Sequence, residues 1–225
     1  MSNDNSLNYS EEMKTHYKSD SVAKEYHEAY SEDGNWRHRL IANRERNAVK
    51  SLLQKVPNES VLDIPTGTGK LAPVFAETGS TIVACDISKD MLNIAKAEYD
   101  RHDVSDVHFL VCDAEEISDM LNKRFDIAVS LRLIHRVPTD VKQTILAELG
   151  TVSDYVITST AIETSFHKAR RSVRRQLIGG DERNHGYDSP KTTREIMTDG
   201  FEIVSSKRVL PVLSQEHVFL LRPIN

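Results

Sequence analysis

The chain is poor in several residue types, and each shortage excludes a class of protein. It has two cysteines in 225 residues, Cys85 and Cys112, which are too few for the disulfide framework of a small secreted domain. Their spacing fits no zinc motif, so we expect buried thiols in a reducing compartment. The nine histidines show no close metal-ligand spacing, and the sequence therefore predicts no metal site.

Long apolar runs and an excess of positive charge are also missing. A transmembrane helix needs about 18 consecutive apolar residues, and no stretch of the sequence is that long. The N-terminus is polar and lacks the apolar segment that a signal peptide contains. We therefore expect a cytoplasmic protein without membrane insertion. The net charge of −5 gives no general reason to expect attraction to nucleic acid. With 39% hydrophobic residues, the composition is that of one globular domain with a full core.

Short apolar runs alternate with helical patterns through the middle of the chain, which predicts parallel βαβ units. Two strand-like runs near the C-terminus predict an antiparallel hairpin. The expected fold is therefore α/β: a doubly wound, seven-stranded Rossmann-like sheet with a C-terminal antiparallel hairpin and helices on both faces. Ser88 and Thr139 are the expected N-caps of two helices. We expect strands at 61–64, 81–85, 107–111, 125–131, 155–159, 201–210 and 216–221, and helices at 22–30, 39–53, 70–78, 89–99 and 140–149.

Three acids end three successive predicted strands, and a glycine-rich turn follows the first of them. The acids are Asp63, Asp86 and Asp113, and the turn contains Gly67 and Gly69. Ligands of open α/β sheets bind at the carboxyl ends of the strands, where these residues should meet. An ionised Asp86 can accept hydrogen bonds from both hydroxyls of a ribose. The sequence thus predicts a nucleoside site, although each acid alone also suits a turn or a helix cap.

Two other nucleotide sites compete with this interpretation. A phosphate-binding P-loop needs a first glycine where Ile64 stands and a hydroxyl where Leu71 stands, so we reject it. Residues 67–72 satisfy the permissive form of the dinucleotide fingerprint, with Asp86 near the expected offset. However, Asp63 would place a carboxylate beside the turn and repel a pyrophosphate. A cationic or zwitterionic nucleoside fits better.

The same residues resemble the motifs of a known family. Residues 63–69 look like motif I of the class I S-adenosylmethionine-dependent methyltransferases, usually Asp/Glu-x-Gly-x-Gly-x-Gly, with Pro65 in place of the first glycine. Residues 86–92 resemble the ribose-binding segment of that family, 113–115 its adenine-binding turn, and 125–130 its fourth strand. The resemblance runs in order from about residue 58 to residue 160. It is closest to the small-molecule branch that includes ubiquinone/menaquinone-type (methyltransferase type 11/12-like) enzymes.

The resemblance implies S-adenosylmethionine as cofactor and S-adenosylhomocysteine as product. Asp63 would lie near the methionyl ammonium, Asp86 would bind the ribose, and Met91 would cover one face of the adenine. The methionyl carboxylate needs a cation, for which we choose Arg39 ahead of Arg37. The implied cofactor-binding residues are Tyr26, Arg39, Asp63, Pro65, Thr66, Gly67, Gly69, Asp86, Ile87, Met91, Asp113, Ala114 and Leu131.

The acceptor side is harder to read. His135 follows the fourth strand and is the best candidate for a general base, with a structural histidine as the alternative. Arg132 is expected to bind an anionic acceptor. Lys168, Arg171 and Arg175 form the basic face of a predicted helix, which is either a solvated face or a wall of the acceptor pocket, and Tyr187 lies on the loop that follows. We expect residues 1–57 to form a polar tail and helical lid, and residues 58–225 the core, with 161–190 as an acceptor-site insert.

The predicted function is methyl transfer to a small anionic or hydroxyl-bearing acceptor, with O-methylation favoured. One alternative is a non-catalytic or regulatory S-adenosylmethionine-binding protein. A nucleic-acid methyltransferase is disfavoured because no Asn/Asp-Pro-Pro-Tyr/Phe motif follows the fourth strand and the net charge is negative. An NAD-dependent oxidoreductase is a further alternative, which a cofactor titration would separate. We expect a small-molecule partner, no nucleic acid, and a monomer or homodimer.

Overall fold

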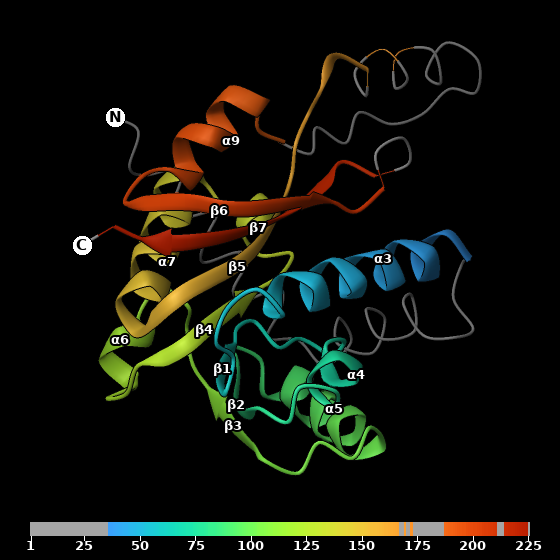
Figure 1. The fold of residues 1–225 in the computed structure, drawn as a ribbon, viewed down its shortest axis with the longest axis vertical. Coiled ribbons are helices and arrows are strands. Elements are labelled where there is room, and N and C mark those ends of the chain that lie inside the picture. The colour runs from blue at the N-terminus through green and yellow to red at the C-terminus, as the bar shows by residue number, and fades with distance from the viewer. Residues whose placement is uncertain (1–35, 167–168, 170–171, 173–186, 211–213, 225) are drawn as a thin grey trace.

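A seven-stranded sheet runs through the middle of the protein. The structure is a computed structural model that describes residues 36–166, 169, 172, 187–210 and 214–224 (Figure 1). The strands lie in the order β3-β2-β1-β4-β5-β7-β6. The first five are parallel, and β7 is antiparallel to both of its neighbours. The predicted fold class is confirmed. The bounds are β1 Ser60–Asp63, β2 Thr81–Asp86, β3 Val107–Val111, β4 Phe125–Ser130, β5 Ser153–Ala161, β6 Phe201–Arg208 and β7 Glu216–Pro223.

Helices cover both faces of this sheet. On one face lie α3 (Trp36–Leu53), α4 (Ala72–Phe75) and α5 (Lys89–Arg101), and on the other lie α6 (Ile117–Met120), α7 (Thr139–Val152) and α9 (Pro190–Met197) (Figure 1). A short 3-10 helix, η1 (Ile134–Arg136), follows β4. Helix α3 packs against β7 and β6. Among the described residues, no helix combines the length and apolar character that crossing a membrane requires.

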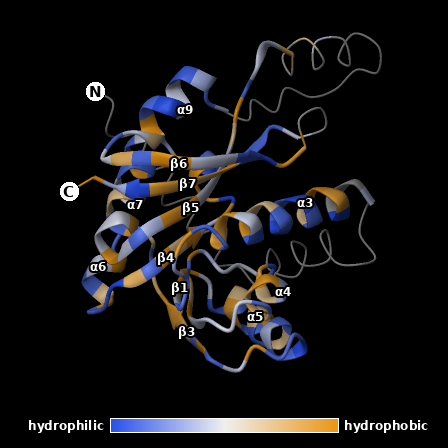
Figure 2. Ribbon diagram, in the orientation of Figure 1, coloured by the Kyte–Doolittle hydropathy of each residue, from blue (hydrophilic) through white to orange (hydrophobic). Residues whose placement is uncertain are grey.

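The central strands are apolar on both faces because each face carries a layer of helices. In β1, Val61 packs in the core under α3 and α4, and its neighbour Leu62 packs in the core under α7. The same alternation recurs in β4, where Ile127 and Ala128 belong to opposite cores. In Figure 2 the strands β6 and β7 show mixed hydropathy colours. The sequence pattern therefore sets central strands covered on both faces, whereas β3 and β6 at the edges are partly exposed.

The boundaries of the helices test the predicted caps. Ser88 caps α5 as predicted, since its Oγ accepts a hydrogen bond from the Met91 N–H at 3.3 Å. The prediction that Thr139 is an N-cap is wrong: Pro138 takes that position, and Thr139 is the first residue of α7. The extended backbone of Pro138 already turns the chain into the helix, and its carbonyl accepts the Lys142 N–H at 2.9 Å.

Three helices differ from the expectation. The helix predicted at 70–78 is shorter, because α4 spans Ala72–Phe75. Helices α6 and α9 were not predicted. Helix α9 had a readable signal, since Ser189 accepts a hydrogen bond from the Thr192 N–H at 3.1 Å and Pro190 occupies the first turn.

Candidate functional site

A cavity opens at the carboxyl ends of the parallel strands, where the strand order reverses between β1 and β4. Its empty space, counted out into the solvent at its mouth, is about 1270 Å³. This is the edge at which open α/β sheets bind ligands. The predicted site residues that line it are Asp63, Pro65, Thr66, Gly67, Asp86, Ile87, Met91, Asp113, Ala114, Leu131 and Arg132.

The two glycines of the turn after β1 have different roles. Both have positive φ, +55° at Gly67 and +77° at Gly69. Gly67 lines the cavity, and a Cβ there would meet no protein atom within 4 Å. A Cβ at Gly69 would lie 3.1 Å from the Cα of Ala95 on α5, so this glycine is needed for close packing of the helix. Gly69 does not itself line the cavity.

Asp63 is buried at the base of the cavity. Its Oδ2 accepts a hydrogen bond from the Thr66 hydroxyl at 2.7 Å and another from the Tyr99 hydroxyl at 3.0 Å. The pKa of Asp63 is raised to about 7, chiefly by burial. The two hydroxyl donors oppose this shift, and the nearby charge of Asp86 adds to it. Sequence reasoning missed Tyr99, because it lies 36 residues away on α5.

Asp86 ties the end of β2 to the glycine turn. Its Oδ2 accepts the Gly67 N–H at 2.8 Å, and its Oδ1 accepts the Ser88 N–H at 2.9 Å. Burial raises the pKa of Asp86, and these backbone donors oppose that shift. Each carboxylate oxygen can accept a second hydrogen bond, so Asp86 retains capacity for a ligand in the cavity.

The segment after β3 closes the same end of the cavity. Asp113 holds its turn through a 3.1 Å hydrogen bond from the Glu115 N–H to its Oδ1. Ala114 is buried beside it, and the buried side chain of Met91 comes from the first turn of α5. These residues give the cavity apolar walls with polar edges.

The other end of the cavity carries buried charge. The guanidinium of Arg132 forms a two-armed ion pair with Glu45 of α3, with nitrogen–oxygen distances of 2.6 and 2.9 Å. Glu216 of β7 lies 3.8 Å from the same guanidinium. The backbone N–H of Arg132 donates to the Ser159 hydroxyl at 2.8 Å. Arg132 thus lines the cavity, with much of the charge of its guanidinium balanced by Glu45.

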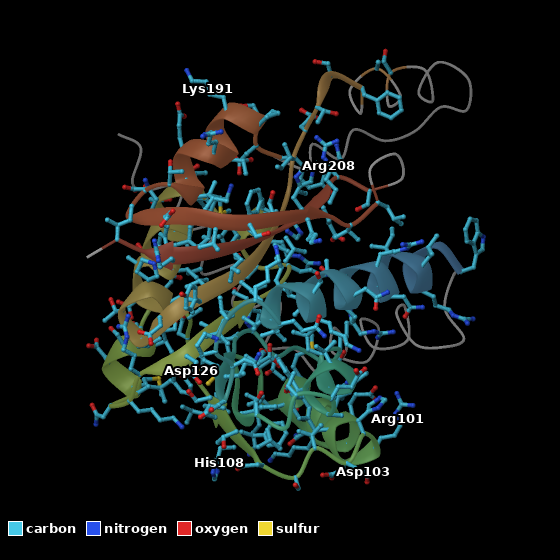
Figure 3. The ribbon with its side chains drawn as sticks, viewed as in Figure 1. Arg101, Asp103, His108, Asp126, Lys191 and Arg208 are labelled. Atoms are coloured by element: carbon cyan, nitrogen blue, oxygen red, sulfur yellow. The ribbon has the colours of Figure 1, made fainter. Side chains whose placement is uncertain are left out.

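Further charged groups surround this pair and perturb one another. Burial lowers the pKa of Lys70, and the positive charge of Arg132 lowers it further. Burial raises the pKa of Glu216 to about 7, and the charge of Glu45 adds to the effect. Arg136 lies near Lys70 and Glu216, and it lines the cavity, as does Arg46. Sequence reasoning missed Glu45 and Glu216, which lie far from every motif. Most charged side chains elsewhere point outward, as Arg101, Asp103 and Lys191 do (Figure 3).

His135 lies just outside the cavity. Its ring is 6.4 Å from that of Tyr187 in an edge-on arrangement, so the structure brings these two predicted residues together. Burial lowers the pKa of His135 to about 3, and the charges of Arg136, Arg132 and Lys142 contribute. The imidazole is therefore neutral at pH 7. Among the described residues, its buried Nδ1 has no hydrogen-bond partner.

The remaining predicted residues fall elsewhere. Arg39 is exposed on α3 and does not line the cavity, whereas Arg46, two turns further along, does. Within the described part of the chain, no group of three or more His, Cys, Asp or Glu side chains is placed to hold a metal ion. Tyr26, Lys168, Arg171 and Arg175 lie outside the described residues, as do most of the expected lid and insert.

Comparison with known proteins agrees with this geometry. Residues 61–154 match the family described as methyltransferase domain. The magnesium protoporphyrin IX methyltransferase from Synechocystis PCC 6803, solved with bound S-adenosylhomocysteine, has the same fold: the TM-score is 0.75 at 17% identity, over 94% of this chain and 98% of that one. Residues 61–154 thus match a methyltransferase domain, which agrees with the predicted class I S-adenosylmethionine-dependent family. The predicted enzyme class and cofactor agree with this match and with the fold.

The curated relatives of this methyltransferase domain act on different kinds of acceptor. The release factor glutamine methyltransferase of Chlorobaculum tepidum is 35% identical over 83 residues, which are 35% of this chain and 28% of that protein. The ubiquinone biosynthesis O-methyltransferase of Hydrogenovibrio crunogenus is 25% identical over 85 residues, which are 38% of this chain and 35% of that protein. The chain thus matches about a third of the length of these relatives. The likeness identifies the domain and leaves the acceptor open.

Proposed function

We propose that this protein transfers the methyl group of S-adenosylmethionine to a small anionic acceptor, with oxygen as the favoured target. The observation that carries the proposal is the convergence of Asp63, the glycine turn, Asp86 and Asp113 on one cavity at the switch point of the sheet.

The residues at the adenosyl end suit the cofactor group by group. Asp63 supplies a negative charge for the ammonium, and Asp86, beside Ile87, supplies acceptors for the ribose hydroxyls. Gly67 leaves open space where a side chain would otherwise stand, so the cofactor can approach the backbone closely. The proposed contacts of the sulfonium and adenine are Pro65, Thr66, Met91, Asp113, Ala114 and Leu131. Arg46, which lines the cavity, replaces Arg39 as our choice for the methionyl carboxylate.

The charges at the other end favour an anionic acceptor. Lys70, Arg132 and Arg136 line that end together with one acid, Glu45, and apolar side chains such as Leu133 complete the walls. Because burial lowers the pKa of Lys70, the two arginines supply the positive charge. Bound S-adenosylmethionine supplies an electrophilic methyl group, which leaves the sulfur as its bond to the acceptor oxygen forms. The sulfonium is positive and an ionised acceptor is negative, and the removal of both groups from water assists the transfer. An ionised acceptor needs no strong base, which agrees with the low pKa of His135.

The experiment is a transfer assay with S-adenosylmethionine labelled in its methyl group. The protein is incubated separately with mixtures of small carboxylates and phenols, with RNA and with proteins, and labelled products are separated by mass spectrometry. We expect label in a small ester or ether, accompanied by S-adenosylhomocysteine. Label in RNA or protein would contradict the acceptor class. Cofactor binding without transfer to any pool would point to a regulatory protein instead. The expected cytoplasmic location and the monomeric or homodimeric state stay predictions.

A further inference from the structure

Tyr99 is a buried tyrosine that no motif of the sequence singles out. It lies in the last turns of α5, with no exposed surface, and its ring packs between two other aromatic rings. The ring centroids are 6.3 Å from Phe75 of α4 and 5.5 Å from Phe109 of β3. This packing fixes the ring, and its hydroxyl ends 3.0 Å from Asp63. A polar group placed so deeply needs such a partner.

The glycine turn brings this hydroxyl within reach of Asp63. A Cβ on Gly69 would lie 3.1 Å from the Cα of Ala95 and 3.1 Å from the Cβ of Glu98. Helix α5 therefore lies directly against the turn at this point. Ala95 and Tyr99 are four residues apart and share one face of the helix. The close approach at Gly69 thus delivers the Tyr99 hydroxyl to the base of the cavity.

Asp63 accepts both of its described hydrogen bonds on one oxygen. The Thr66 hydroxyl, at 2.7 Å, and the Tyr99 hydroxyl, at 3.0 Å, both donate to Oδ2. Two donors on one oxygen fix the rotation of the carboxylate and leave Oδ1 for a ligand. Because Asp63 lines the cavity, that ligand is the group that binds there.

We propose that Tyr99 is a positioning residue of the cofactor site, which holds Asp63 so that its second oxygen meets the ammonium group of S-adenosylmethionine. The inference rests on the proposed function, because it assumes that the cavity binds this cofactor. Tyr99 acts through Asp63 and touches no reacting atom.

The surroundings of Asp63 give this hydrogen bond a measurable consequence. The ionisable groups near its carboxylate are Tyr99 on α5 and Asp86 and Cys85 on β2. None of these carries a positive charge, so hydroxyl donors stabilise the ionised form of Asp63. Burial and the charge of Asp63 raise the pKa of Tyr99, which therefore remains a donor across the accessible pH range. Loss of the hydroxyl should raise the pKa of Asp63 above its value of about 7.

The test compares Tyr99→Phe with Tyr155→Phe, a matched control near the start of β5, which β4 separates from β1 in the sheet. Calorimetry measures the affinity for S-adenosylhomocysteine between pH 6 and 8.5, and carbon NMR follows the Asp63 carboxyl without ligand. At pH 7 we expect Tyr99→Phe to bind about fivefold more weakly, because a rise of about one unit from a pKa of about 7 lowers the ionised fraction of Asp63 by that factor. The midpoints of both the binding curve and the carboxyl titration should move to higher pH. The rate at saturating cofactor should stay the same, and Tyr155→Phe should match the wild type.

Other results would overturn the inference in distinguishable ways. If the carboxyl titration and the pH profile of binding are the same in Tyr99→Phe and wild type, Tyr99 does not position Asp63, whatever the enzyme does. If wild type binds no S-adenosylhomocysteine, the proposed function fails and takes the cofactor part of the inference with it. Should Tyr99→Phe not fold, replacing tyrosine by 3-fluorotyrosine gives a stronger donor of nearly the same size. The Asp63 midpoint should then fall, and an unchanged midpoint would contradict the proposal.

Discussion

The two ends of the cavity are built in different ways. At the end proposed for the adenosyl group, each of the three acids bonds a group two or three residues away: Asp63 with Thr66, Asp86 with Ser88, and Asp113 with Glu115. Longer contacts add to these turns, from Gly67 to Asp86 and from Tyr99 to Asp63. At the end proposed for the acceptor, the central contact joins Arg132 to Glu45, which lies 87 residues earlier in the chain. The first end is thus built mainly on local turns at strand ends, whereas the second is a long-range network of buried charges.

This difference separates what the fold supplies from what this chain adds. Turns at strand ends are fixed by short segments, and a common cofactor can be held by the same segments in many proteins. The buried charges come from α3, from the segment after β4 and from β7, and each charge is costly to bury without its partner. We therefore expect mutations at the adenosyl end to affect cofactor binding most, and mutations at the acceptor end to affect stability and acceptor chemistry.

Asp86→Asn should produce the largest effect. The variant loses the negative charge that we propose faces the ribose, and it turns its amide N–H toward the backbone N–H of Gly67 or Ser88. Hydrogen bonds to a charged group contribute about 1.5–3 kcal/mol each, so we expect affinity for S-adenosylhomocysteine to fall about 100-fold or more by calorimetry. Asp106→Asn is the matched control, because Asp106 is exposed and accepts a hydrogen bond from Thr81. Equal affinities for both variants would contradict the assignment of Asp86.

Glu45→Ala should mainly reduce stability. It leaves the buried guanidinium of Arg132 with Glu216, at 3.8 Å, as its nearest described acid. Removing one partner of a buried ion pair costs about 3–5 kcal/mol, and Glu216 should offset part of this cost. We therefore expect the free energy of unfolding, measured in urea, to fall by about 3 kcal/mol. Glu202→Ala, which removes an exposed partner of Arg222, should leave the melting temperature unchanged. If both variants melt alike, the charged end is not held by this pair.

His135→Ala should have the smallest effect and should act on the acceptor side alone. With a pKa of about 3, the imidazole is too weak a base for a large contribution near pH 7, so we expect a drop of about tenfold in single-turnover rate. Affinity for S-adenosylhomocysteine should not change. In wild type, the rate should show no step near pH 6.5 from this group. His108→Ala, on the surface strand β3 (Figure 3), is the control. An unchanged rate in His135→Ala would remove His135 from the reaction.

The features that the sequence predicts, and those that it does not, follow the same division between the two ends of the cavity. The order of apolar runs and the acids at their ends predicted the sheet and the adenosyl end, because strand alternation and turn chemistry are encoded within a few residues. Glu45, Tyr99 and Glu216 could not be read, because their partners are brought together by helix packing and by the final strand pairing. The prediction that Thr139 caps α7 was wrong for a local reason, because Pro138 directly before it is the N-cap of that helix.

The most direct test of the account is a crystal structure of the protein with S-adenosylhomocysteine. We predict density for the ligand over the turn at Gly67, with the ribose hydroxyls on the Asp86 carboxylate and the amino group facing Asp63. Density for the adenosyl group anywhere else, or a cavity that excludes it while binding a nicotinamide dinucleotide, would contradict the account.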